Sequence, residues 1–186
     1  MNQFILGRKL KMTQIWKDGK VIPVTVIKAD PNSISTIRTK DNNGYEAIQL
    51  SMPFGKKRIL REFRTKGDIE LKTGDSIDVS LFNEGDKVKV SSKSKGRGFQ
   101  GTVKRYNFSG GPKTHGQKNR LRAPGSIGAT FPQRVIKGKR MAGHMGVERF
   151  SVKNIRVVGI DKEKNELFLR GAVPGYNGTV VKVVKN

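Results

Sequence analysis

Short runs of alternating apolar and polar residues, separated by turn residues, fill both ends of the chain. Alternation of this kind is typical of half-buried strands. Short helical turns are predicted after Gly101 and near Lys56–Leu60. The predicted strands span residues 20–27, 33–39, 45–52, 76–81, 87–90, 150–160, 166–170 and 178–184.

Turn residues mark where these strands are expected to reverse. Asp41–Gly44 predicts a turn before the run at 45–52, and Asp161–Asn165 predicts a charged turn. Pro23 lies inside the first predicted strand and indicates an edge, a bulge or a strand start, because proline donates no backbone hydrogen bond. Many short strands favour an antiparallel sandwich or barrel, and closure of a barrel removes exposed edges. The predicted fold is therefore mostly β, with a small closed β-barrel.

The alternation of apolar and polar residues stops in a long segment, residues 93–148, between two predicted strands. Apolar residues are scattered there and lack a sustained period, so this segment stays loose unless a partner orders it. We therefore predict a β-barrel domain from residues 1–92 together with 149–186, and an irregular basic extension at 93–148 inserted between strands. Strands on the two sides of the insertion then have to pair with each other. Insertions of this length are usually functional or disordered.

Most of the chain's excess positive charge lies in the inserted segment and the strand before it. The chain has 38 Lys or Arg and 15 Asp or Glu, a net charge of +23. From Lys87 to Val147 there is no Asp or Glu, whereas this stretch holds 15 of the basic residues and 11 of the chain's 22 glycines. A segment with such an excess of positive charge needs negative charge from outside the chain. A nucleic-acid backbone supplies it as closely spaced phosphates. The glycines let the main chain approach a phosphate or a sugar.

The candidate nucleic-acid contacts are most of the basic side chains and both imidazoles of this segment, with hydroxyls and aromatic rings between them. They are Lys93, Lys95, Arg97, Lys104, Arg105, Lys113, His115, Arg120, Arg122, Arg134, Lys137, Lys139, Arg140 and His144. Aromatic rings at Phe99, Tyr106, Phe108 and Phe131 are candidates for stacking on unpaired bases. For Phe99 and Phe108, packing against the β-core is the favoured expectation.

Other chemistries lack the residues they need. The chain has no Cys and only two His, without nearby acids, so we expect no metal, no cofactor and no catalytic site. Gly96–Gly101 has the pattern G-x-G-x-x-G. A dinucleotide site also needs an Asp or Glu about 20 residues further along the chain, and this acid is missing. The N-terminus has no signal-peptide pattern, and no apolar run is long enough for a membrane span.

Two alternatives to RNA binding stay open at this point. A DNA-binding architectural protein needs a groove-reading helix or β-ribbon, and the sequence offers neither. An RNA-processing enzyme needs converging acids, bases or metal ligands, and none converge. Competition between RNA and duplex DNA distinguishes an RNA-binding protein from the DNA-binding alternative. Turnover of RNA distinguishes it from the enzyme.

Six motifs follow one another in a fixed order. They are Val21–Ile27, Lys93–Phe108 (KSKGRGFQGTVKRYNF), Thr114–Gly116, Arg122–Gly128 (RAPGSIG), Lys137–Gly146 (KGKRMAGHMG) and Gly171–Gly175 (GAVPG). Together they resemble the family of bacterial large-subunit ribosomal protein L3 (uL3), and the resemblance covers nearly the whole chain.

The resemblance implies a structural protein of the large ribosomal subunit in the cytoplasm, with no enzymatic activity. It implies that the extension binds 23S rRNA, supports early subunit assembly and shapes RNA near the peptidyl transferase centre. The tip nearest that centre is expected at Gly125, Ser126, Ile127, Gly128, Ala129, Thr130, Phe131, Pro132 and Gln133. Proteins L14 and L19 are the expected neighbours, and no homo-oligomer is expected.

Overall fold

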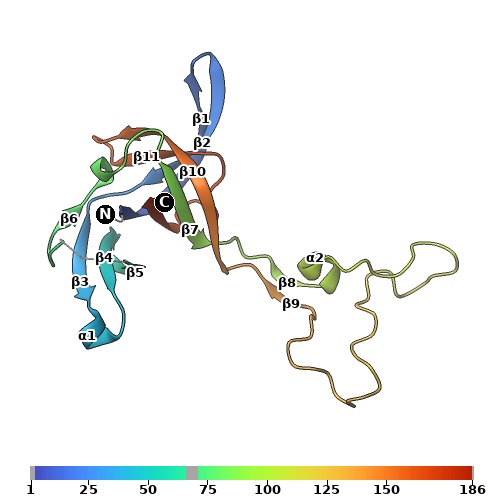
Figure 1. The fold of residues 1–186 in the computed structure, drawn as a ribbon. Helices are drawn as coiled ribbons and strands as arrows, with labels where there is room; N and C mark the ends of the chain where they lie inside the picture. Colours follow the sequence, from blue (N-terminus) through green and yellow to red (C-terminus); the bar gives the residue numbers. More distant parts are fainter. Residues whose placement is uncertain (1–2, 66–70, 186) are drawn as a thin grey trace. The chain divides into compact units, whose positions relative to one another are not determined.

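The structure is a computed structural model that describes residues 3–65 and 71–185. It divides into two compact units (Figure 1). The first unit comprises the described residues of Met1–Ser94 and Arg149–Asn186, and the second unit is Lys95–Glu148. Strands dominate and helices are few and short, which confirms the prediction of a mostly β chain.

Six antiparallel strands of the first unit form a closed barrel. Their order is β1 (Phe4–Lys17), β12 (Val180–Lys185), β7 (Lys87–Lys93), β10 (Arg149–Asp161), β11 (Glu166–Arg170) and β2 (Lys20–Lys28). The sheet closes because β1 pairs with β12 on one side and with β2 on the other. Closure gives each of these strands two neighbours within the barrel, whereas the outer parts of β1 and β2 pair only with each other as a hairpin.

A second sheet of four strands belongs to the same unit. Its order is β5 (Lys57–Arg64), β4 (Ala47–Phe54), β3 (Asn32–Arg38) and β6 (Ser76–Ile77). The one-turn helix α1 (Lys40–Asn43) joins β3 to β4, and the 3₁₀-helix η1 (Val79–Leu81) follows β6. Both sheets contribute to one hydrophobic core, in which the rings of Phe4 and Phe63 stack with their centroids 4.6 Å apart.

The core follows directly from the alternation in the sequence. Val88 and Val90 of β7 are fully buried, as are Val181 and Val183 of β12 on the neighbouring strand. Successive side chains of a strand point to opposite faces, so residues two apart share the buried face. Burial of one such side chain stabilises the fold by about 1.5–3 kcal/mol.

The strands on the two sides of the inserted segment pair with each other, as predicted. β7 and β10 are antiparallel neighbours, with Lys93 opposite Arg149 and Val90 opposite Val152. The chain therefore leaves the barrel at the end of one strand and re-enters it at the start of the adjacent one. The sheet is continuous without the residues between them.

Seven predicted strands are confirmed, with ends that shift by at most three residues. Pro23 lies at an edge, as expected, because the pairing of β2 with β11 ends at Val24. The predicted charged turn also forms, and the amide of Lys164 donates to the Asp161 carboxylate at 3.0 Å. The turn at Asp41–Gly44 takes the form of α1, whose end is marked by Gly44 at φ 73°.

Two local predictions were wrong. The run 76–81 is a strand only as far as Ile77, because the Asp78 carboxylate accepts the amide of Ser80 at 2.9 Å and starts η1. A helical turn was expected at Lys56–Leu60, yet these residues belong to a hairpin in which Phe54 lies opposite Lys57. Gly55, at φ 61°, provides the tight turn of this hairpin.

The longest strand, β1, was not predicted. Its hairpin with β2 turns through Asp18 (φ 52°) and Gly19 (φ 70°), with Lys17 opposite Lys20. An Asp-Gly pair between two strands is the preferred sequence of a two-residue turn with positive φ at both positions. That signal was present in the sequence and identifies the hairpin.

Candidate nucleic-acid interface

A small frame of regular structure organises the second unit. Strands β8 (Gly98–Gln100) and β9 (Gly143–Met145) pair antiparallel, with Phe99 opposite His144. The amide of Arg97 extends this pairing by donating to the carbonyl of Met145 at 2.9 Å. Strands of three residues that contain glycine give almost no sequence signal, which is why they were not predicted. The frame brings the two ends of the acid-free segment together.

Helix α2 (Thr102–Tyr106) follows β8 and confirms the helical turn expected after Gly101. Asn107 ends the helix in the left-handed conformation, at φ 59°, and its amide donates to the carbonyl of Thr102. Two basic residues occupy the last turn, where the exposed carbonyl groups favour positive charge. A five-residue helix is marginal alone, so its contacts with the rest of the second unit determine its stability.

Arg105 joins this helix to the returning strand. Its Nη1 atom donates to the carbonyl of Met141 at 2.8 Å. The guanidinium groups of Arg105 and Arg140 lie 5.0 and 5.6 Å from the centroid of the Tyr106 ring, which is cation–π distance. Arg105 therefore holds the loop in place with part of its hydrogen-bonding capacity.

Two glycines close loops of the second unit where no side chain fits. A Cβ atom added to Gly146 would lie 2.2 Å from the carbonyl oxygen of Lys95, and one added to Gly110 would lie 2.2 Å from that of Leu121. Both glycines have positive φ, 87° and 74°. These contacts are between main-chain segments, so they give the loops a defined course without a hydrophobic core.

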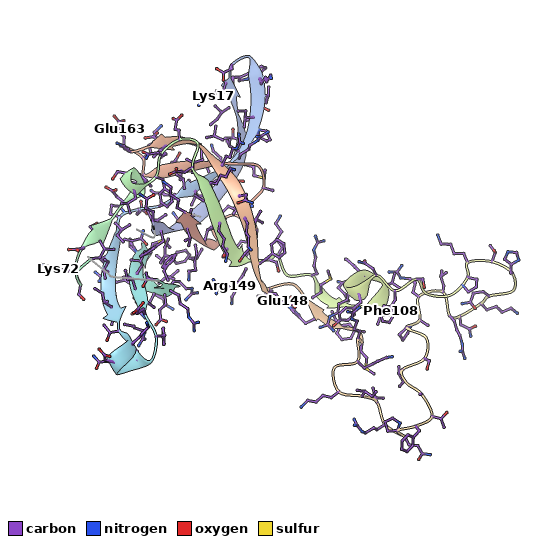
Figure 2. All side chains as sticks on the ribbon, in the orientation of Figure 1. Lys17, Lys72, Phe108, Glu148, Arg149 and Glu163 are labelled. Carbon is purple, nitrogen blue, oxygen red and sulfur yellow. The ribbon has the colours of Figure 1, made fainter. Side chains whose placement is uncertain are left out.

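The predicted contact residues are almost all accessible. Every one of these side chains is exposed except that of Arg105, which is half-buried. Lys93 is the last residue of β7 and belongs to the first unit, whereas the other thirteen belong to the second. Figure 2 shows that side chains along the loops after Phe108 project away from the backbone.

The aromatic residues divide into two groups. Phe99 is 76% exposed and Phe131 is 87% exposed, so the expectation that Phe99 packs in a core was wrong. Phe99 lies in the two-stranded sheet of β8 and β9, outside the hydrophobic core of the first unit. Phe108 is half-buried, and its ring lies 6.3 Å from that of Tyr106. Phe99 and Phe131 are thus the rings with open faces.

The predicted tip, Gly125–Gln133, is exposed apart from Pro132, which is half-buried. The hydroxyl of Ser126 donates to the carbonyl of Gly128 at 2.9 Å and tightens the loop. The Phe131–Pro132 peptide bond is cis. Ser126 also lines a cavity of about 980 Å³, which is bordered by Phe108, Gln117 and Arg120.

Positive charge is concentrated in the second unit. Its 54 residues hold 12 Lys or Arg and a single acid, Glu148, so its net charge is +11 of the chain's +23. Among the residues that the structure describes, no group of three His, Cys, Asp or Glu is placed to hold a metal ion. Within the same part of the chain, no helix is long and apolar enough to cross a bilayer. Cations on loops without a core of their own are suited to a polyanionic partner.

Comparison with known proteins gives a consistent match. Residues 69–183 match the model of the family described as ribosomal protein L3. "Large ribosomal subunit protein uL3" of Dehalococcoides mccartyi (strain BAV1) is 45% identical over 202 residues, covering 100% of this chain and 98% of the relative. The uL3 proteins of Deinococcus radiodurans and Streptomyces coelicolor are 46% and 44% identical, covering 95% and 96% of this chain and 92% and 94% of the relatives.

These matches define a structural protein of the large ribosomal subunit rather than an enzyme. The chain belongs to the ribosomal protein L3 family.

Proposed function

We propose that the chain binds 23S rRNA through its second unit, Lys95–Glu148, and thereby supports early assembly of the large subunit. The observation that carries this proposal is the exposure of nearly all the basic side chains on loops that glycine contacts hold in a defined course. Within the ribosome of the cytoplasm, phosphates packed around these loops supply the counter-charge that the unit lacks.

Most of the basic residues act by neutralising phosphates and releasing condensed cations. The proposed contacts are those named from the sequence, with Arg105 mainly positioning the loop through Met141. Phe99 and Phe131 stack on unpaired bases with their open faces. Contacts with phosphate fix the position of the protein on the RNA and make the binding salt-dependent. Stacking on bases distinguishes unpaired nucleotides from duplex.

The tip, residues 125–133, is proposed to shape RNA near the peptidyl transferase centre. It has the compact turns and exposed backbone that close approach to RNA requires. The closed barrel of the first unit is the scaffold, and L14 and L19 are its proposed neighbours. We propose that the chain enters the subunit as one copy and carries out no chemistry there.

A competition assay tests this function. The full chain is expected to bind a structured 23S rRNA fragment at least about tenfold more tightly than duplex DNA of equal length at one salt concentration. The logarithm of the binding constant should fall linearly with the logarithm of the salt concentration, and Lys137→Gln should reduce the slope by about 1. Equal affinity for duplex DNA favours an architectural DNA-binding protein, and turnover of RNA by the pure protein favours an enzyme.

A further inference from the structure

A cationic pocket of about 420 Å³ lies in the first unit, apart from the segment proposed to bind rRNA. Its lining includes the rings of Phe4 and Phe63 and the charged side chains of Arg64, Lys89, Arg149 and Lys182. The charged residues come from four strands, β5, β7, β10 and β12. The fold therefore gathers four positive charges around a partly apolar depression.

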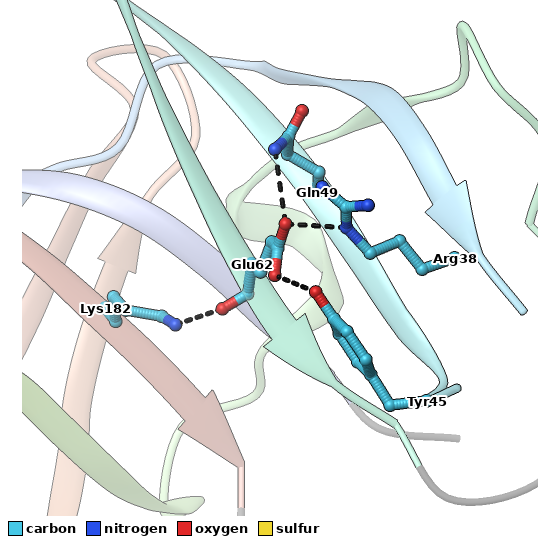
Figure 3. A network of polar contacts seen from close by, with 5 residues as sticks. All are labelled: Arg38, Tyr45, Gln49, Glu62 and Lys182. Carbon is cyan, nitrogen blue, oxygen red and sulfur yellow. Dashed lines mark hydrogen bonds and ion pairs between the residues drawn. The ribbon is translucent and has the colours of Figure 1, made fainter. Parts of the chain in front are cut away.

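Lys182 is the central residue of this pocket. Its half-buried ammonium group lies 4.2 Å from the centroid of the Phe63 ring and donates a hydrogen bond to the main-chain carbonyl of Glu62 (Figure 3). The pKa of Lys182 is lowered to about 8, first by burial and then by the charges of Arg149, Arg61 and Lys89, against the opposing effect of Glu62. The free protein thus holds this ammonium where its positive charge is disfavoured.

The one acid that lines the pocket is already engaged. The Glu62 carboxylate accepts hydrogen bonds from Arg38 at 2.7 Å, from Tyr45 at 3.0 Å and from Gln49 at 3.4 Å (Figure 3). These bonds, with that from Arg38 first, lower the pKa of Glu62, so it stays ionised toward Arg38. Four cations against one acid leave the lining residues with a net charge of +3.

We propose that this pocket is a phosphate-binding site, separate from the second unit. Residues with ammonium and guanidinium groups line the pocket from four strands, and these groups are the donors that phosphate oxygens accept from. The hydroxyl of Ser91, 2.7 Å from that of Ser151, adds a neutral polar group to the lining. The buried residues Phe4 and Phe63 also line the pocket, and an apolar wall strengthens electrostatic attraction.

The natural source of the phosphate is the rRNA backbone, and to that extent the inference rests on the proposed function. Inorganic phosphate shares the same chemistry and serves as the probe. The fork of an arginine matches carboxylate as well as phosphate oxygens. Phosphate is favoured here because the proposed partner, rRNA, supplies it, and because the volume suits one compact oxyanion with its attached sugar. An acidic peptide is nevertheless included in the test.

The test uses the full-length chain, with the side-chain signal of Lys182 followed by NMR from pH 6.5 to 10. Without phosphate, Lys182 should titrate near its pKa of about 8. Saturating inorganic phosphate, at ionic strength matched with chloride, should raise this pKa by about one unit or more, because a nearby anion favours the charged form. By the same linkage, phosphate should bind progressively more weakly as the pH rises through about 8.

Variants that each remove one positive charge test whether phosphate binds in the pocket. Lys89→Gln and Arg149→Gln should each weaken phosphate binding about tenfold, the typical effect of removing one charge-assisted contact. Lys153→Gln removes an exposed charge from β10 outside the pocket, and it should change the affinity less than about twofold. The Lys182 signal and the thermal transition show in the same samples that each variant is folded.

Three results would overturn the proposal: a Lys182 pKa unmoved by phosphate, equal effects of Arg149→Gln and Lys153→Gln, or tighter binding of a Glu-rich peptide than of an RNA of equal charge. The last result assigns the pocket to an acidic protein partner. Displacement of phosphate by a 23S rRNA fragment identifies the RNA backbone as the source. These readouts come from the first unit, so they distinguish a failure here from a failure of RNA binding by Lys95–Glu148.

Discussion

Replacing residues 95–148 by Asn-Gly is expected to lower the affinity for 23S rRNA by at least about a thousandfold at moderate salt, because the loss of only three charge-assisted phosphate contacts, at about 1.5 kcal/mol each, has that effect. The replacement removes a net charge of +11 from the chain. The first unit should stay folded, because β7 and β10 are already paired as far as Lys93 and Arg149. A short turn can join them as an ordinary hairpin.

The matched control replaces the same 54 residues by a Gly-Ser linker of equal length. It keeps the spacing between the two strands and removes the charge and the loop contacts. Both chains are compared with the full chain by filter binding over a series of salt concentrations, and by thermal unfolding of the barrel. Full rRNA affinity in either replacement would place RNA binding in the first unit.

Gly146→Ala is expected to weaken rRNA binding by about tenfold to a hundredfold while leaving the barrel unchanged. The added methyl group would lie 2.2 Å from the carbonyl oxygen of Lys95, and the backbone has φ 87°, which alanine rarely adopts. Each of these costs on the order of 1–3 kcal/mol, so the loop has to shift. If the shifted loop loses a contact with RNA, the binding free energy falls by the free energy of that contact.

Gly101→Ala is the control for this substitution. Gly101 has φ −69°, and no atom beyond its two chain neighbours lies within 4 Å of the position of an added Cβ. We expect less than a twofold change in affinity, because alanine adopts this backbone conformation without strain. Equal effects of the two substitutions would show that the close contact between Gly146 and Lys95 has no part in binding.

Much of the β structure was predictable because the core depends on local alternation. The burial of Val88 and Val90, and the pairing of strands on both sides of the inserted segment, follow from period and turn chemistry alone. The predictions failed where a single residue redirects the backbone. Asp78 converts an expected strand into η1 through a capping contact, and Gly55 turns an expected helix into a hairpin through its positive φ. Hydrophobic periodicity contains no information on such residues.

The candidate interface was predictable in its charge and not in its geometry. The absence of acids from Lys87 to Val147 identifies the basic segment without any structure. That Arg105 fastens a loop to Met141, 36 residues away, depends on a non-local contact. The pocket around Lys182 is less visible still, because its charges lie on four strands and each resembles an ordinary exposed residue in the sequence.

Lysine reactivity in intact large subunits, purified through a high-salt gradient, tests most directly whether the second unit is the RNA-binding part. This unit has six lysines, Lys95, Lys104, Lys113, Lys118, Lys137 and Lys139. We expect most of them to be acetylated at least about tenfold more slowly in the subunit than in the free chain, because phosphates cover them. If all six react as fast in the subunit as in the free chain, this segment does not bind rRNA.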